Sequence, residues 1–135
     1  MALIDWNESF SVNVRQIDAQ HRQVIEMINS LHAAMQSGKG RQEVGEIIRK
    51  MVEYTRQHFS TEEKLLSEHG YAGYQAQKAA HDAFTARVTD FERQYQSNPL
   101  VLSLEVMNFL KEWWTGHILG EDQKYSAFLN EKGVR

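Results

Sequence analysis

The sequence predicts an all-α protein, an up-down-up-down antiparallel four-helix bundle preceded by an extended N-terminal arm. Three observations lead to this prediction. Apolar residues recur at intervals of three and four along four long stretches, which is the periodicity of amphipathic helices. Only a few residues connect one stretch to the next, and short connections make neighbouring helices antiparallel. No stretch shows the alternation of apolar and polar residues that is typical of strands.

The chain begins with the arm, residues 1–17, which carries several apolar side chains able to pack on the bundle. The first helix is predicted over 18–37, with Asp18 as its N-cap. Gly38 and Gly40 then break the helical pattern.

The second and third helices are predicted over 42–68 and 75–96. Gly70 follows the second helix closely, and glycine suits the left-handed conformation that often succeeds a helix C-terminus. The residues between Gly70 and the third helix form a short turn, which is too short for anything but an antiparallel reversal.

The fourth helix is predicted over 99–129, after a strong boundary in the sequence. Asn98 suits the N-cap, and the only proline of the chain, Pro99, suits the first helical position. All four helices belong to a single domain over 1–135, because this length is typical of one domain with a substantial core.

Composition excludes several classes of function. The chain has no cysteine, which rules out disulfides, thiolate metal sites and cysteine nucleophiles. A net charge of −3 without a basic block argues against a nucleic-acid partner. No apolar run approaches the roughly 20 residues of a membrane span. No signal peptide is visible either, so we expect a cytoplasmic protein with no membrane partner.

Histidines and carboxylates continue the apolar stripes of the helices. His58 and Glu62 are four residues apart and therefore share one helix face, although such a pair alone is equally compatible with a satisfied core contact. In an antiparallel bundle, the start of one helix lies beside the end of the next. The topology therefore brings six residues to one layer at the same end of the molecule: His21, His58, Glu62, Gln77, His81 and His117.

The other two histidines do not belong to this layer. His32 and His69 each lie eleven residues beyond a member of the layer, about 16 Å further along a helix axis. We expect His32 to be partly exposed at the edge of the core. His69 is expected near a helix C-terminus, where a partial positive charge is favourable.

Asp122 follows His117 by five residues, about 140° further around an ideal helix, so the two do not share a face. If both bind one centre, the helix must widen locally or Asp122 must approach from the side. We therefore predict a π-type irregularity between them. On its own, Asp122 would be interpreted as a solvated helix carboxylate.

Imidazoles with two carboxylates and no thiolates suit iron, manganese or zinc. Because carboxylates can bridge, two of them among several histidines suggest two metal ions. Ferritin-like di-iron bundles use Glu-x-x-His pairs and more carboxylates. This chain has His-x-x-x-Glu and more histidines, which indicates a different family.

The motifs resemble those of the hemerythrins, specifically the single-domain bacterial hemerythrins. The resemblance covers almost the whole chain and rests on Trp6, Ile17–His21, His58–Glu63, Gly70–Tyr74, His81–Phe84, Trp113, His117–Ile118 and Asp122–Tyr125. It implies two iron ions bridged by Glu62, Asp122 and a solvent-derived oxo or hydroxo group. One iron would be held by His21 and His58 with an open position for dioxygen. The other would be held by histidines of the third and fourth helices.

The sequence departs from the family pattern at two positions. The family has histidines at both 77 and 81, whereas this chain has Gln77 and His81. Gln77 can offer a weak amide ligand, leave room for water, or be a bystander. Trp114 stands where the family usually has a leucine near the dioxygen pocket. The apolar wall of that pocket would consist of Phe59, Trp113, Trp114 and Ile118, although ordinary core packing is the alternative for these residues.

The resemblance implies a dioxygen-binding protein for carriage, storage or scavenging, which is not an enzyme. We expect a monomer that passes oxygen to a recipient the sequence does not identify. The alternative is a di-iron redox protein with peroxide-consuming or autoxidising activity, because Gln77 replaces a ligand histidine. Storage of iron or zinc without oxygen binding is a third reading, and a bundle without metal leaves the convergent histidines unexplained.

Overall fold

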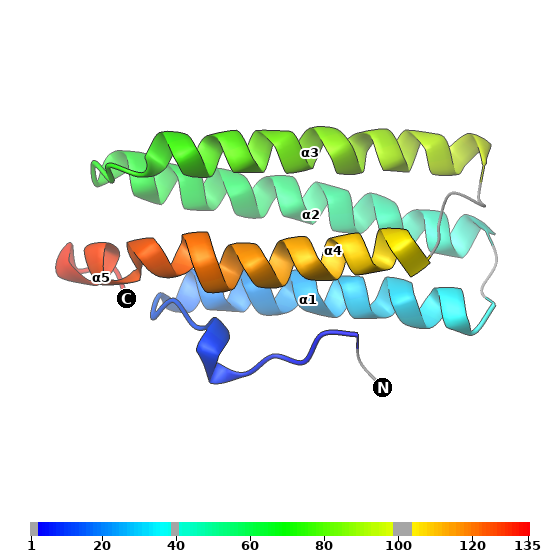
Figure 1. The fold of residues 1–135 in the computed structure, drawn as a ribbon, viewed down its shortest axis with the longest axis horizontal. Coiled ribbons are helices and arrows are strands. Elements are labelled where there is room, and N and C mark those ends of the chain that lie inside the picture. Colours follow the sequence, from blue (N-terminus) through cyan, green and yellow to red (C-terminus); the bar gives the residue numbers. More distant parts are fainter. Residues whose placement is uncertain (1–2, 39–40, 99–103) are drawn as a thin grey trace.

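Four long helices lie side by side in the computed structural model, which describes residues 3–38, 41–98 and 104–135 (Figure 1). Successive helices run in opposite directions, so the predicted antiparallel four-helix bundle is confirmed. The helices are α1 (Arg15–Gln36), α2 (Arg41–Glu68), α3 (Tyr74–Ser97), α4 (Leu104–His117) and α5 (Gln123–Glu131), with a π-helical segment η3 (Ile118–Asp122) joining α4 to α5. None of the helices described is both long and apolar enough to cross a membrane.

The prediction that Asp18 is the N-cap of the first helix is wrong. The helix α1 begins at Arg15, which places Asp18 within its first turn. The Asp18 carboxylate instead accepts hydrogen bonds from the Val12 backbone N–H at 2.9 Å and the Ser11 hydroxyl at 2.6 Å. A carboxylate in the first turn is favourable beside the positive end of the helix dipole. Asp18 therefore fastens the arm to α1 rather than capping the start of the helix.

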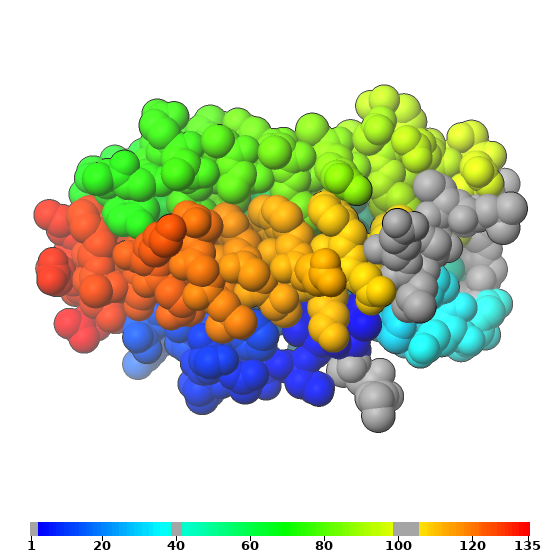
Figure 2. All heavy atoms as spheres, viewed as in Figure 1, coloured from blue at the N-terminus to red at the C-terminus, as the bar shows by residue number. Residues whose placement is uncertain are grey.

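The arm packs along the bundle and contains one 3-10 turn, η1 (Glu8–Phe10). Its start is held by Asn29 of α1, which exchanges two hydrogen bonds of 2.9 Å with the Ile4 backbone. Its end is held by α5, where the Ser126 hydroxyl donates to the Val12 carbonyl at 2.7 Å. The described arm thus contacts both α1 and α5, and in the space-filling view it lies along one side of α4 (Figure 2).

The end of α2 confirms the prediction that Gly70 takes the left-handed conformation. Gly70 has φ +74°, and the Tyr71 N–H reaches back to the Leu66 carbonyl at 2.9 Å. The Gly70 N–H also bonds to the Ser67 carbonyl, which completes a Schellman motif. This tight end turns the chain into α3. The predicted start of the last helix at Pro99 lies outside the described residues.

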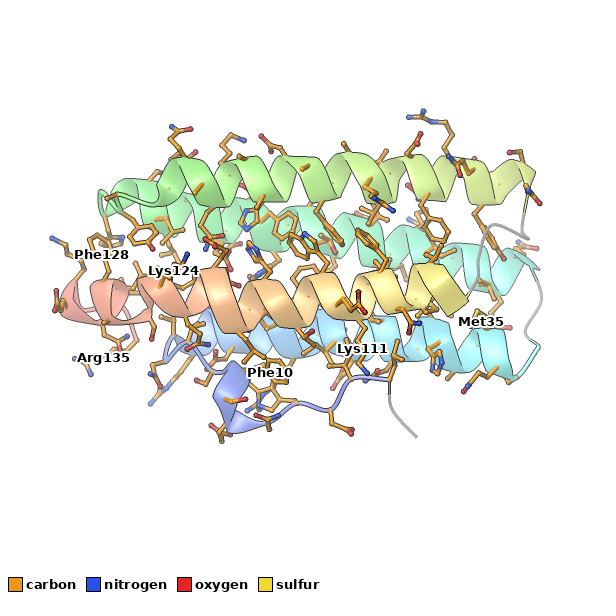
Figure 3. All side chains as sticks on the ribbon, viewed as in Figure 1. Phe10, Met35, Lys111, Lys124, Phe128 and Arg135 are labelled. Carbon is orange, nitrogen blue, oxygen red and sulfur yellow. The ribbon has the colours of Figure 1, made fainter. Side chains whose placement is uncertain are left out.

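Two apolar clusters fill the bundle on either side of a polar layer. The larger cluster includes Val24, Phe59 and Trp114, whereas the smaller one includes Ile17 and Tyr125. Along each helix the polar residues lie between members of the two clusters, and side chains occupy the space between the ribbons (Figure 3). The polar layer is therefore enclosed by apolar side chains above and below.

Candidate metal centre

Seven polar side chains from all four helices of the bundle meet in this layer. Each is buried, and six of them are at most 1% exposed. They are His21 from α1, His58 and Glu62 from α2, Gln77 and His81 from α3, His117 from α4 and Asp122 from η3. The structure thus brings together every residue that the sequence predicts for the site, including Asp122.

Each of the two carboxylates lies between histidines of different helices. Glu62 Oε2 lies 3.1 Å from His58 Nε2 and 3.4 Å from His21 Nε2, whereas Glu62 Oε1 lies 3.1 Å from His81 Nε2. Asp122 Oδ2 lies 3.2 Å from His21 Nε2, and Asp122 Oδ1 lies 3.2 Å from His117 Nε2. Each carboxylate therefore has one oxygen toward a first half of the site, which contains His21 and His58, and the other toward a second half, which contains His81 and His117.

Gln77 is part of the second half. Its amide oxygen lies 3.0 Å from His117 Nε2, and its amide N–H donates to Asp122 Oδ1 at 3.0 Å. His81 Nε2 and His117 Nε2 are 3.3 Å apart. Two neutral imidazoles cannot both point a lone pair at each other favourably, so this close approach suits a shared proton or cation.

Several buried polar atoms of the layer form no hydrogen bond of normal geometry among the described residues, although most of them lie 3.1 to 3.4 Å from an oppositely charged group. They are Nε2 and Nδ1 of His21, Nε2 of His58, Oε1 of Glu62 and Oδ2 of Asp122. Leaving buried polar groups unpaired costs free energy, and native structures rarely do so without a reason. Two groups of side chains offer ligand atoms that all lie within 4.8 Å of one another, close enough to bind one cation each. The groups share Glu62, and they are His21, His58 and Glu62, and Glu62, His81, His117 and Asp122. This donor set fits metal ions of the nitrogen- and oxygen-preferring kind.

The backbone between His117 and Asp122 is a π-helix, as the five-residue spacing predicts. A π-turn adds about one residue to the helical turn, which rotates Asp122 toward the face of His117. Asp122 is fully buried as a result. The local widening therefore explains how both residues reach the same layer.

Outer hydrogen bonds hold three of the side chains in place. His58 Nδ1 pairs with the Gln20 amide oxygen at 2.8 Å, and His81 Nδ1 pairs with Glu63 Oε2 at 2.9 Å. Such bonds keep the proton on Nδ1 and leave the Nε2 lone pair facing the centre. The hydroxyl of buried Tyr125 donates to Glu62 Oε2 at 3.0 Å.

The sequence reasoning assigned no role to Gln20, Glu63 or Tyr125. A signal was present for each of them, since Gln20 and Glu63 adjoin His21 and Glu62 in sequence. Tyr125 follows Asp122 by three residues and therefore shares its helix face. The sequence alone does not show that Gln20 reaches His58, that Glu63 reaches His81, or that Tyr125 reaches Glu62.

Aromatic rings border the two halves of the site differently. Trp113 stacks on His117 with centroids 4.5 Å apart, and Phe59 stacks on His81 at 3.9 Å. Trp114 instead borders His21 at 6.5 Å and His58 at 6.0 Å. Because Phe59 also lies 5.9 Å from the His58 ring, it borders both halves, whereas Trp113 and Trp114 border different histidines and Ile118 is buried at the start of η3.

The two excluded histidines lie where the sequence places them. His32 is partly exposed on α1. His69 directly follows α2, and its Nδ1 pairs with the Leu65 carbonyl at 2.7 Å. Neither belongs to the groups of potential metal ligands found among the described residues.

The buried charges perturb one another strongly when no metal is bound. Burial lowers the pKa of His21, but its contacts with Asp122 and Glu62 outweigh this effect and raise the pKa to about 9. Burial and the nearby His21 lower the pKa of His58. Burial alone would raise the pKa of Glu62, yet the surrounding histidines bring it well below its usual value. The metal-free site therefore holds carboxylates with a protonated histidine between them.

These shifts predict the pH dependence of stability of the metal-free protein. A group with a raised folded-state pKa stabilises the fold fully below its unfolded pKa, and this stabilisation is lost as pH rises through the folded pKa. For His21 the window runs from about pH 6.5 to about pH 9. We expect the unfolding free energy to fall by about 3 kcal/mol across this window.

Urea unfolding of protein treated with a chelator, measured from pH 6.5 to 9, checks this dependence. The raised pKa of His81 acts in the same direction. The variant His21→Gln should flatten most of the slope, whereas His32→Gln, outside the layer, should keep it. A wild-type profile that stays flat over the window would contradict the account.

Comparisons with known proteins show which family and fold this chain resembles. A family model described as hemerythrin HHE cation binding domain matches residues 12–129. A bacteriohemerythrin of Stenotrophomonas maltophilia is 40% identical over 135 residues, covering 97% of this chain and 87% of the relative. One of Methylococcus capsulatus is 30% identical, covering 96% and 99%. The crystal structure of a wild-type hemerythrin superposes with a TM-score of 0.89 at 29% identity, covering 95% of this chain and 98% of the other.

Proposed function

Because this chain belongs to the hemerythrin family, we propose that it holds two iron ions and binds dioxygen reversibly at one of them. The single observation that carries the proposal is the orientation of Glu62 and Asp122. Each carboxylate has one oxygen toward His21 and the other toward a histidine of the second half. Bridging carboxylates of this kind are suited to a pair of metal ions rather than one.

The donor count supports an open position on one side. His21, His58 and the bridging carboxylates serve one half, whereas His81, His117 and Gln77 join the same carboxylates in the other. With one protein ligand fewer, an ion held by His21 and His58 would have room for an exogenous molecule. When bound, two ferrous ions supply the two electrons that reversible dioxygen binding requires.

The protein's own contribution is to orient ligands and exclude water. Gln20 and Glu63 hold the imidazoles of His58 and His81 with their Nε2 atoms inward. Apolar side chains close the layer, and Phe59 and Trp114 are both at most 3% exposed. A dry, apolar surrounding limits access of protons and water, which favours release of dioxygen over its irreversible reduction.

A second function is favoured by one observation, the position of Gln77. Its amide oxygen lies 3.0 Å from His117 Nε2, where it can act as a neutral ligand to the second ion. An amide oxygen binds iron more weakly than an imidazole does, so a water molecule can compete for this position. Peroxide consumption or fast autoxidation would follow if both ions were accessible.

Stoichiometry tests the proposed oxygen carrier. Anaerobic titration of the metal-free protein should end at two ferrous ions per chain. Mixing with dissolved oxygen should then consume one dioxygen per pair of ions, as an oxygen electrode measures. Two ions without oxygen uptake would support storage of metal instead, and repeated uptake in the presence of a reductant would support the redox alternative.

The hydroxyl of Tyr125 is expected to strengthen iron binding through Glu62. Burial and the adjacent carboxylates raise the pKa of Tyr125 well above its usual value, so it remains a donor at neutral pH. Tyr125→Phe should weaken ferrous ion binding by roughly 10- to 100-fold in a chelator competition assay. Tyr71→Phe is a matched control, because Tyr71 packs edge-on against Tyr125 without contacting Glu62 in the described structure. If both variants bind ferrous ion with equal affinity, the Tyr125 hydroxyl does not contribute to iron binding.

A further inference from the structure

Trp114 buries a hydrogen-bond donor that has no acceptor. The side chain is 1% exposed, and its indole Nε1 has no hydrogen-bond partner among the described residues. Indole N–H groups usually find a partner when they are buried, because an unpaired buried donor is costly. Beside a candidate ligand site, such a donor is available to an acceptor that is not part of the chain.

The position of Trp114 indicates where that acceptor would bind. Its ring lies 6.5 Å from the His21 ring and 6.0 Å from the His58 ring, between centroids. The Nε2 atoms of both histidines face carboxylate oxygens at 3.1 to 3.4 Å without forming a hydrogen bond of normal geometry. The unpaired indole therefore borders the half of the site that has the fewer potential protein ligands.

The neighbouring tryptophan provides a contrast. Trp113 is partly exposed and stacks face to face on His117, with an angle of 11° between the rings. It thus covers the other half of the site by ring contact. Adjacent residues on a helix point about 100° apart, so the two indoles serve different halves.

We propose that the Trp114 indole N–H donates a hydrogen bond to the small ligand that occupies the open position beside His21 and His58. The proposal rests on the proposed function and adds a ligand-binding residue to it. The ligand class is dioxygen or a small anion with a terminal atom that keeps a free lone pair. Because indole only donates and does not release its proton at neutral pH, it stabilises negative charge on the ligand without protonating it.

Azide is the probe that tests this donor, since it carries a terminal lone pair and a full charge. The diferric protein is titrated with azide, and the ligand-to-iron charge-transfer band gives the dissociation constant. Trp114→Phe keeps an aromatic ring but removes the N–H. Hydrogen bonds to charged acceptors are the stronger ones, so we expect affinity to fall by roughly 10-fold or more.

Trp6→Phe is the matched control. Trp6 also has a buried Nε1 without a partner in the described structure, but it lies in the arm, where it packs against Phe10 and Arg22. The same chemical change there should leave azide affinity unaltered. Trp114→Leu serves as a second variant, and it should lose affinity as Trp114→Phe does if the N–H is what matters.

A vibrational readout separates a hydrogen bond from a packing effect. The antisymmetric stretch of bound azide should shift between H₂O and D₂O in the wild type and lose that shift in Trp114→Phe. Trp114→Phe also leaves a small cavity in the core, so urea unfolding of the metal-free variant should show a loss of stability that measures the packing effect separately from the azide readouts. Equal azide affinity and an equal isotope shift in both proteins would overturn the inference while leaving the oxygen carrier intact. If the wild type forms two-iron protein but binds neither azide nor dioxygen, the proposed function itself fails.

Discussion

Replacing Glu62 with glutamine should abolish the two-iron centre. Glu62 is fully buried and has one oxygen toward His21 and His58 and the other toward His81. Glutamine has a single acceptor oxygen and no charge, so it cannot bridge two cations or offset their repulsion. Losing an outer partner of a metal ligand already costs 10- to 100-fold in affinity, so losing the bridge should cost at least about 100-fold.

Elemental analysis after ferrous loading and gel filtration measures this effect. Bound iron should fall from two ions per chain to one or fewer. Glu53→Gln is the control, because Glu53 is an exposed carboxylate on the same helix and should leave loading unchanged. Glu62→Asp, which retains the charge on a shorter side chain, should be intermediate. Two tightly bound ions in folded Glu62→Gln protein would contradict the bridging role.

Restoring a histidine at position 77 should tighten iron binding by an order of magnitude and slow autoxidation. Gln77 is 1% exposed, and its amide lies between His117 and Asp122, so the substituted imidazole would face the second ion. Imidazole is a better ligand for iron than a neutral amide oxygen. A filled coordination position on this ion would also exclude the water through which oxidation can proceed.

Chelator competition and the decay of the oxygenated spectrum in air measure the two effects of Gln77→His. The comparison variant is Gln77→Leu, which removes both hydrogen bonds of the amide and should weaken binding. If neither substitution changes affinity or autoxidation, Gln77 is a bystander. In that case the redox alternative loses its structural basis.

Much of this architecture could be predicted from the sequence because it depends on periodicity. Apolar residues at helical spacing define the bundle, and antiparallel order brings His21, His58, His81 and His117 to one end. The π-segment at Asp122 could also be predicted, since a five-residue spacing and a shared centre are incompatible with a regular helix.

Contacts between distant segments could not be predicted in the same way. Asp18 has the composition of an N-cap, but its oxygens bind the arm, which local sequence patterns do not reveal. The two hydrogen bonds of Gln77 depend on the placement of η3, and the sequence therefore left its role open. Trp113 and Trp114 look alike in sequence, yet a rotation of one residue places them beside different histidines.

The measurement that tests the central claim most directly is a cycle of visible spectra. Protein loaded anaerobically with ferrous iron is exposed to air and then returned to an oxygen-free atmosphere. A reversible oxygen carrier develops a ligand-to-iron charge-transfer band in air and loses it when oxygen is removed, over several cycles. Direct conversion to a stable diferric spectrum that persists without oxygen would contradict reversible binding and favour the redox function.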